Sequence, residues 1–251
     1  MKFANVNGER REPSPGIRGH CFLCGSEMIS KCGEKVIWHW AHKGRRTCDH
    51  YWENETDWHR AWKNLFPKEQ QEVVHTDDKG EKHFADVKLD NGFVLEFQNS
   101  PIPIKELKSR NDFYKDIAWI VNGLSKRESD YKELCRLMKN GNRINQIPLA
   151  YMIDTHSSKL VREWAGTGKS VFFDFSVEDI KLGKSLWLLI PIECYEKSIL
   201  IEVHLNDLLP LISMDMTNLK RITEQLLHSI EVQFSMYKQR ARLGPFKAYC
   251  R

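Results

Sequence analysis

Four cysteines in the first fifth of the chain, with two histidines just before the last of them, have a spacing typical of a zinc site. Two residues separate Cys21 from Cys24, and such a turn can supply two thiolates from one loop. A His/Cys pair across an intervening hairpin would complete the four ligands of a tetrahedral ion. Four protein ligands leave no open position for water, so we expect a structural zinc ion. Its expected ligands are Cys21, Cys24, His42 and Cys48.

Other assignments of this segment stay open. His39 could replace His42, because both lie in the run WHWAH, and Cys32 before Gly33 is expected at the turn of the hairpin. The alternative to a metal site is a set of reduced free thiols beside surface histidines. A disulfide framework is not favoured, because the seven cysteines are an odd number and the first residues have no apolar core of a secretion signal.

Residues 83–100 are expected to form a hairpin that carries paired carboxylates. A three-residue loop at residues 90–92 gives a register in which the apolar residues share one face. A two-residue Asn-Gly turn would put Val87 opposite Glu96 and mix the faces, so the hydrophobic pattern argues against it. The expected apolar pairs are Leu89 with Phe93, Val87 with Leu95, and Ala85 with Phe97.

The other face of this hairpin then places Asp86 opposite Glu96, with Gln98 two residues further on. Opposed carboxylates destabilise a sheet unless something compensates their charge. Mg²⁺ or Mn²⁺ would do so, since these ions take carboxylate oxygens, waters and substrate phosphate, and can activate water toward a phosphodiester. The simpler interpretation is the solvated face of an ordinary antiparallel hairpin.

A helix expected at residues 53–66, ended by Pro67, places three polar side chains along one face at i, i+4 and i+8. Glu55 could add a third carboxylate to the metal site, His59 could orient a water or contact phosphate, and Lys63 could pair with phosphate. The alternative is a solvated face with charge pairing along the helix.

The elements around these residues predict an α/β protein in three parts. A polar arm (1–20) and the zinc-finger-like module occupy residues 1–50, and the mixed-sheet core flanked by helices occupies residues 51–125. An α+β region follows at residues 126–251, with apolar strands and a long final helix at residues 217–242.

Composition limits the classes of protein. The 251 residues (29.5 kDa) are 41% hydrophobic, which is enough for a packed core. A net charge of +4 permits a nucleic-acid partner without requiring one. No segment approaches about 18 uncharged apolar residues. We therefore expect a cytoplasmic protein with no membrane contact.

Taken together, these motifs resemble the competence protein CoiA-like nuclease family over residues 21–122. The motifs that carry the resemblance are Cys21-x2-Cys24, His39-Trp-Ala-His42 with Cys48, Glu55-x3-His59-x3-Lys63, Phe84-Ala-Asp86-Val87, Glu96-Phe-Gln98-Asn-Ser100, and Arg110 with Tyr114. The resemblance implies a restriction-endonuclease-like core of the PD-(D/E)xK superfamily. It also implies Asp86 and Glu96 as core metal ligands and Glu55 as the helix acid. Gln98 stands where the superfamily usually has lysine, but the family itself has a Glu-x-Gln pattern.

The implied activity is that of a Mg²⁺- or Mn²⁺-dependent deoxyribonuclease (endonuclease) acting in DNA uptake, recombination or defence. In this interpretation Gln98 positions the attacking water, and Lys63 or Arg110 supplies positive charge. Nucleic-acid contacts are expected from Lys43, Arg45, Arg46 and Arg110. Besides DNA, a protein partner or a second copy could bind through the C-terminal region. The alternatives are a zinc-stabilised DNA-binding or adaptor protein with an inactive nuclease-like core, or a purely structural assembly protein.

Overall fold

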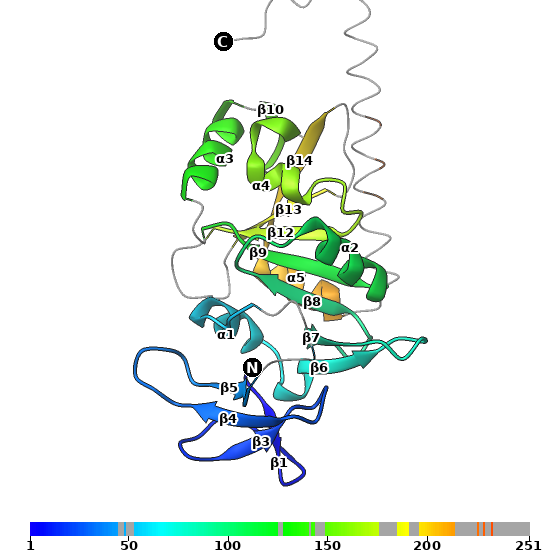
Figure 1. The fold of residues 1–251 in the computed structure, drawn as a ribbon. Helices are drawn as coiled ribbons and strands as arrows, with labels where there is room; N and C mark the ends of the chain where they lie inside the picture. The colour runs from blue at the N-terminus through cyan, green and yellow to red at the C-terminus, as the bar shows by residue number, and fades with distance from the viewer. Residues whose placement is uncertain are drawn as a thin grey trace, which may run out of the picture.

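The computed structural model describes residues 1–44, 48, 53–124, 128–140, 142–143, 149–175, 185–190 and 196–213, together with positions 225, 228 and 232. These residues form two sheets and five α-helices, so the protein is mixed α/β (Figure 1). The expected final helix lies outside the described residues except at those three positions, which are helical. No helix in the described part of the chain is long and apolar enough to cross a membrane.

The first sheet is built from residues 4–42 and corrects our expectation of a loose arm at residues 1–20. Val6 pairs with Glu9 across an Asn7-Gly8 loop, in which both residues have positive φ (54° and 90°). This is the geometry of a two-residue hairpin turn, and the Asn-Gly signal was present in the sequence. The strands of this first sheet, in spatial order, are β2 (Glu9–Arg11), β1 (Ala4–Val6), β3 (Arg18–His20), β4 (Glu27–Lys31) and β5 (His39–His42).

The second sheet has nine strands, and its order is β10-β11-β14-β13-β12-β9-β8-β7-β6. The strands are β6 (Gln71–Thr76), β7 (Lys82–Lys88), β8 (Val94–Gln98), β9 (Ile117–Asn122), β10 (Asn142–Arg143), β11 (Ala150–Asp154), β12 (Ser170–Asp174), β13 (Ser185–Leu189) and β14 (Lys197–His204). β9 runs parallel to both β8 and β12. The sheet therefore continues across residue 125, where we expected a boundary between two parts.

Helices cover both faces of this sheet. One apolar cluster contains Leu107, Leu134 and Trp164 from three different helices, and the other contains Trp62 and Leu205 from two more. The first three helices are α2 (Ile104–Phe113), α3 (Glu128–Asn140) and α4 (Lys159–Trp164), and the other two are α1 (Asp57–Lys63) and α5 (Leu205–Ser213).

The hairpin of β7 and β8 has the register that the hydrophobic pattern predicted. Val87 pairs with Leu95, and the Leu89 amide donates to the Phe93 carbonyl at 2.9 Å. Gly92 lies at φ +86° in the loop, which any larger side chain would strain. The pairing of β7 with β8 stops at Val87. Ala85 and its expected partner Phe97 pack in different apolar clusters.

Helix α1 is shorter than expected, since it begins at Asp57 rather than at residue 53. Thr56 ends the extended segment before it: the Thr56 hydroxyl accepts the His59 amide, and the His59 ring bonds the Thr56 amide in return. Such a capping box fixes the first helical turn. Glu55 therefore precedes the helix, and the expected helical face that joins it to His59 and Lys63 does not exist.

A buried carboxylate fixes α1 to the sheet. Asp174 in β12 is 1% exposed, and its Oδ2 accepts hydrogen bonds from the indole nitrogens of Trp58 (2.9 Å) and Trp62 (3.0 Å). Hydrogen bonds to a charged acceptor are stronger than neutral ones. The second half of the chain therefore positions the helix that carries His59 and Lys63.

Candidate functional sites

The four expected zinc ligands lie together. The ligand atoms of Cys21, Cys24, His42 and Cys48 are all within 4.8 Å of one another. His42 Nε2 lies 3.4 Å from the sulfurs of both Cys24 and Cys48. Ideal tetrahedral zinc, with Zn–S about 2.3 Å and Zn–N about 2.0 Å, separates such atoms by about 3.6 Å. The cluster thus fits a zinc ion in number, chemistry and spacing.

Strand alternation selects His42 over His39. Successive side chains in a strand point to opposite faces, so His39 and His42 in β5 face opposite ways. His39 Nδ1 lies 2.8 Å from the Ile37 carbonyl instead. Cys32 lies in the loop between β4 and β5, outside the cluster. Burial raises the pKa of the Cys21 thiol to about 12, so a metal must displace a proton there.

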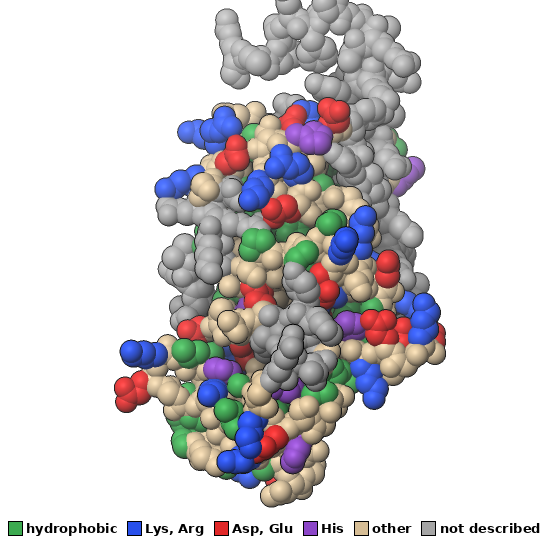
Figure 2. Space-filling view, viewed as in Figure 1, with side chains coloured by type: hydrophobic (Ala, Val, Ile, Leu, Met, Phe, Trp, Pro, Cys, Tyr) green, Lys and Arg blue, Asp and Glu red, His purple; other side chains and the backbone are tan. Residues whose placement is uncertain are grey.

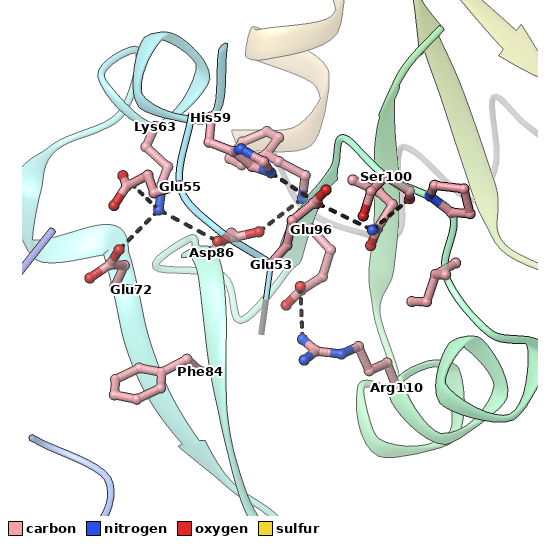
Figure 3. A pocket seen from close by; sticks show the side chains of 14 residues that line it. Glu53, Glu55, His59, Lys63, Glu72, Phe84, Asp86, Glu96, Ser100 and Arg110 are labelled. Carbon is pink, nitrogen blue, oxygen red and sulfur yellow. Dashed lines mark hydrogen bonds and ion pairs between the residues drawn. The ribbon is translucent and has the colours of Figure 1, made fainter. Parts of the chain in front are cut away.

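The second site is a cavity of about 100 Å³ between α1, β7, β8 and α2 (Figure 3). Several waters would fit in this volume. All six expected catalytic residues line it, namely Glu55, His59, Lys63, Asp86, Glu96 and Gln98, and so does Arg110. Glu53 and Glu72 line it as well, and neither was singled out from the sequence.

Asp86 and Glu96 both line the cavity but have different partners. Asp86 Oδ2 accepts the Phe97 amide at 3.0 Å, where a backbone carbonyl would bond in a regular ladder, and its Oδ1 lies 3.7 Å from Lys63. Glu96 Oε2 accepts from Arg110 at 3.1 Å. The hairpin thus brings both carboxylates to one cavity, and each already has a cation beside it.

Glu53 is a further carboxylate beside Asp86 and Glu96 in the cavity, a role that we expected of Glu55. Its Oε2 accepts the Asn99 amide at 2.8 Å and lies 3.2 Å from both Gln98 Nε2 and His59 Nε2. Its Oε1 is buried and makes no hydrogen bond. Burial would raise the pKa of Glu53, but hydrogen bonds from His59, Ser100 and Asn99 lower it below the ordinary value. Glu53 is therefore a carboxylate with one oxygen fixed and one oxygen available in the cavity.

Glu55 is instead part of a buried ion network. Its Oε1 lies 2.8 Å from Arg60 and 3.1 Å from Lys63, and its Oε2 lies 3.8 Å from the amino group of Met1. Burial would raise the pKa of Glu55, but Lys63, the amino group and Arg60 lower it to about 2. Its side chain is 3% exposed. This carboxylate, expected as the third metal ligand, already has three cations beside it.

Replacing Glu55 by glutamine is expected to lower the free energy of unfolding by about 3 kcal/mol or more, because it leaves buried cations uncompensated. The pKa of Glu55 is depressed, so its contribution is complete above about pH 5 and is lost as pH falls from its ordinary value of 4.5 toward 2. Urea unfolding of both proteins between pH 3 and 7 checks this, with exposed Glu81→Gln as the control. A constant difference over that range would contradict it.

Lys63 is expected from the sequence at a phosphate, but it lies buried among carboxylates. Its ammonium lies 2.9 Å from Glu72, 3.1 Å from Glu55 and 3.7 Å from Asp86, as Figure 3 shows. Burial would lower the pKa of Lys63, but Glu72, Glu55 and Asp86 raise it. The ammonium therefore stays charged and offsets the carboxylates of the cavity.

The other expected nucleic-acid contacts are also paired, or are not described. Arg110, expected to contact nucleic acid, is 7% exposed and binds Glu96 and Glu106. Lys43 binds Glu27 at 2.8 Å, and Arg45 and Arg46 lie outside the described residues. On the face drawn in Figure 2, basic side chains of the described residues are interspersed with acidic ones rather than gathered in one strip.

The carboxylates of the cavity are not drawn together as closely as the cysteine cluster. Among the residues that the structure describes, that cluster is the one group of three or more His, Cys, Asp or Glu side chains placed so that they could hold a metal ion. The cavity nevertheless offers the oxygen donors that Mg²⁺ and Mn²⁺ prefer, including the buried Oε1 of Glu53. The donor chemistry fits a hard divalent cation, and its binding would require the side chains to turn toward it.

Comparisons of this chain with family models, with curated proteins and with solved structures find no match.

Proposed function

We propose that the protein is a metal-dependent nuclease of the PD-(D/E)xK type that hydrolyses phosphodiester bonds in DNA, with a structural zinc module at its N-terminal side. The proposal rests on the motifs that resemble the CoiA-like family and on one observation. That observation is the convergence of Glu53, Asp86 and Glu96 on a single cavity, together with Lys63 and Gln98.

In this proposal Asp86, Glu96 and Glu53 hold a Mg²⁺ or Mn²⁺ ion. The ion would supply Lewis acidity that activates water and offsets charge on the phosphodiester. His59 and the Asn99 amide keep the Glu53 carboxylate in place. Lys63 provides the positive charge that the superfamily lysine usually provides, from a helix instead of from the strand.

Gln98 would orient a water through its amide oxygen, which can accept a hydrogen bond from that water. The Gln98 Nε2 donates to Glu53 Oε2 at 3.2 Å and to the Ser100 carbonyl at 2.8 Å. An amide held by two acceptors has little freedom to rotate, which suits a positioning role. It brings no charge, so Lys63 and Arg110 carry the electrostatic part.

The test of this assignment is Glu53→Gln. Mn²⁺-dependent cleavage of single-stranded and plasmid DNA is expected to fall by about 10²-fold or more, because one ion ligand is lost. Zinc content and the temperature of thermal unfolding should stay near those of the unmodified protein. The matched control is Glu69→Gln, an exposed acid outside the cavity. Unchanged cleavage in Glu53→Gln would show that Glu53 only holds Gln98 and the end of β8.

A second candidate function is DNA binding by a nuclease-like core that does not cut. It is favoured by the ion pair between Glu96 and Arg110, which neutralises one of the proposed ligands, and by the lack of charge on Gln98. The same cleavage panel separates the two functions. DNA that is bound in a salt-dependent way but left intact with every divalent metal would support the inactive core.

A further inference from the structure

Three carboxylates lie in one row across adjacent strands. Gln71 pairs with Val87 and Val73 with Ala85, so Glu72 in β6 lies opposite Asp86 in β7. The register of β7 and β8 ends at the pair Val87–Leu95, and its extension by one residue aligns Glu96 with Asp86. The Glu72–Asp86 pair is skipped in its ladder, and Glu72 has φ +44°. A left-handed conformation is costly for a glutamate and persists only where the surroundings impose it.

Glu72 is held by the backbone of Lys2 and Phe3, which precede β1, and by Lys63 of α1. The Lys2 amide donates to both oxygens of Glu72 at 2.8 Å, and the Phe3 amide donates to Oε2 at 3.1 Å. Lys63 Nζ donates to Oε1 at 2.9 Å. One buried carboxylate therefore joins the backbone that enters β1 to the ammonium in the cavity.

The same backbone is tied to the strand that carries a zinc ligand. The Trp40 amide donates to the Met1 carbonyl at 2.8 Å, and Trp40 lies in β5 two residues before His42. A short series of hydrogen bonds thus runs from the zinc module to Lys63. The order of contacts is Trp40, the backbone of residues 1–3, Glu72 and then Lys63.

The distances at Lys63 indicate what Glu72 does. Lys63 Nζ lies 2.9 Å from Glu72 but 3.7 Å from Asp86, so it is held closer to the carboxylate on the far side of the cavity. An ammonium in direct contact with Asp86 would compete with a metal ion for that carboxylate. We propose that Glu72 is a positioning residue that draws Lys63 away from Asp86, and that the backbone of residues 2 and 3, just before β1, keeps Glu72 in place. This inference rests on the proposed function, because it concerns the same metal site.

Titration of the zinc-loaded protein with Mn²⁺, followed by calorimetry and by the electron paramagnetic resonance signal of the ion, tests the proposal. Glu72→Gln keeps the shape and an acceptor for the backbone amides but removes the nearer of the two charges, Glu72 and Glu55, that hold Lys63 away from Asp86. Mn²⁺ affinity is expected to fall about tenfold as the ammonium moves onto Asp86. Glu69→Gln should bind Mn²⁺ like the unmodified protein.

A double variant separates positioning from a merely structural role. In Glu72→Gln/Lys63→Met the competing ammonium is gone, so Mn²⁺ affinity should return to within about twofold of Lys63→Met alone. A Glu72→Gln protein with unchanged Mn²⁺ affinity and only a lower unfolding temperature would overturn the proposal. So would a double variant that stays as weak as Glu72→Gln.

Two further variants keep the test decisive. Glu72→Asp shortens the side chain by one methylene and so moves the carboxylate away from Lys63. This variant is used if Glu72→Gln does not fold. It should weaken Mn²⁺ binding about threefold, and unchanged binding overturns the inference. Asp86→Asn is titrated alongside. Loss of binding in Asp86→Asn with normal binding in Glu72→Gln overturns this inference alone, whereas normal binding in both overturns the proposed function.

Discussion

Asp86→Asn is expected to lose Mn²⁺-dependent DNA cleavage by about 10²–10³-fold or more while the protein stays folded. The Asp86 carboxylate lies between the Lys63 ammonium and the Phe97 amide. The asparagine oxygen can still accept that amide, so the hairpin should keep its geometry. The loss would therefore report the missing charge, and a cleavage assay with circular dichroism on the same samples measures both quantities.

The matched control is Asp90→Asn at the tip of the same hairpin, where the carboxylate is exposed and accepts from Gln70 at 3.0 Å. It should cleave like the unmodified protein. DNA binding by Asp86→Asn should be retained or strengthened, because removing a negative charge reduces repulsion of phosphates. Cleavage by Asp86→Asn at the normal rate would remove Asp86 from the reaction.

Removal of zinc is expected to unfold the first sheet. A structural zinc ion in small modules contributes folding free energy on the order of 10 kcal/mol, and the five short strands here have a small core. That core includes Cys21 itself beside Met28 and Trp40. Chelation should therefore shift tryptophan fluorescence and expose residues 1–44 to protease, with one zinc released per chain by elemental analysis.

Cys24→Ser and Cys32→Ser form the matched pair for this prediction. Cys24 belongs to the ligand cluster and Cys32 does not, although both are thiols of the same module. Cys24→Ser should lose zinc and the protease resistance of the first sheet, and Cys32→Ser should keep one zinc per chain. Equal zinc content in the two variants would contradict the assignment of ligands.

Sequence patterns were sufficient to predict features that depend on residues close together in the chain. The Cys-x2-Cys spacing found the knuckle, and strand parity explains why His42 and not His39 completes the cluster. The alternation of apolar residues found the register of the hairpin, since a shift by one residue would expose its apolar face. These features depend on neighbours in sequence, which a pattern can report.

Long-range contacts explain what the sequence did not reveal. We extended the helical periodicity past Thr56, although the Thr56 cap begins the helix at Asp57, two residues after Glu55, and this is why Glu53 was not considered. No local pattern marks Glu72, because its role comes from the backbone of residues 2 and 3 about 70 positions away. The parallel pairing of β9 with β12 is similarly non-local, and it carries the sheet across residue 125.

The most direct test of the central claim is the anomalous diffraction signal of Mn²⁺ in crystals of the zinc-loaded protein. The proposed function predicts a manganese peak within about 2.5 Å of carboxylate oxygens from both Asp86 and Glu96, with Glu53 on the same ion. Manganese bound elsewhere, or no manganese in the cavity while the ion pairs of Lys63 and Arg110 stay as they are, would contradict it.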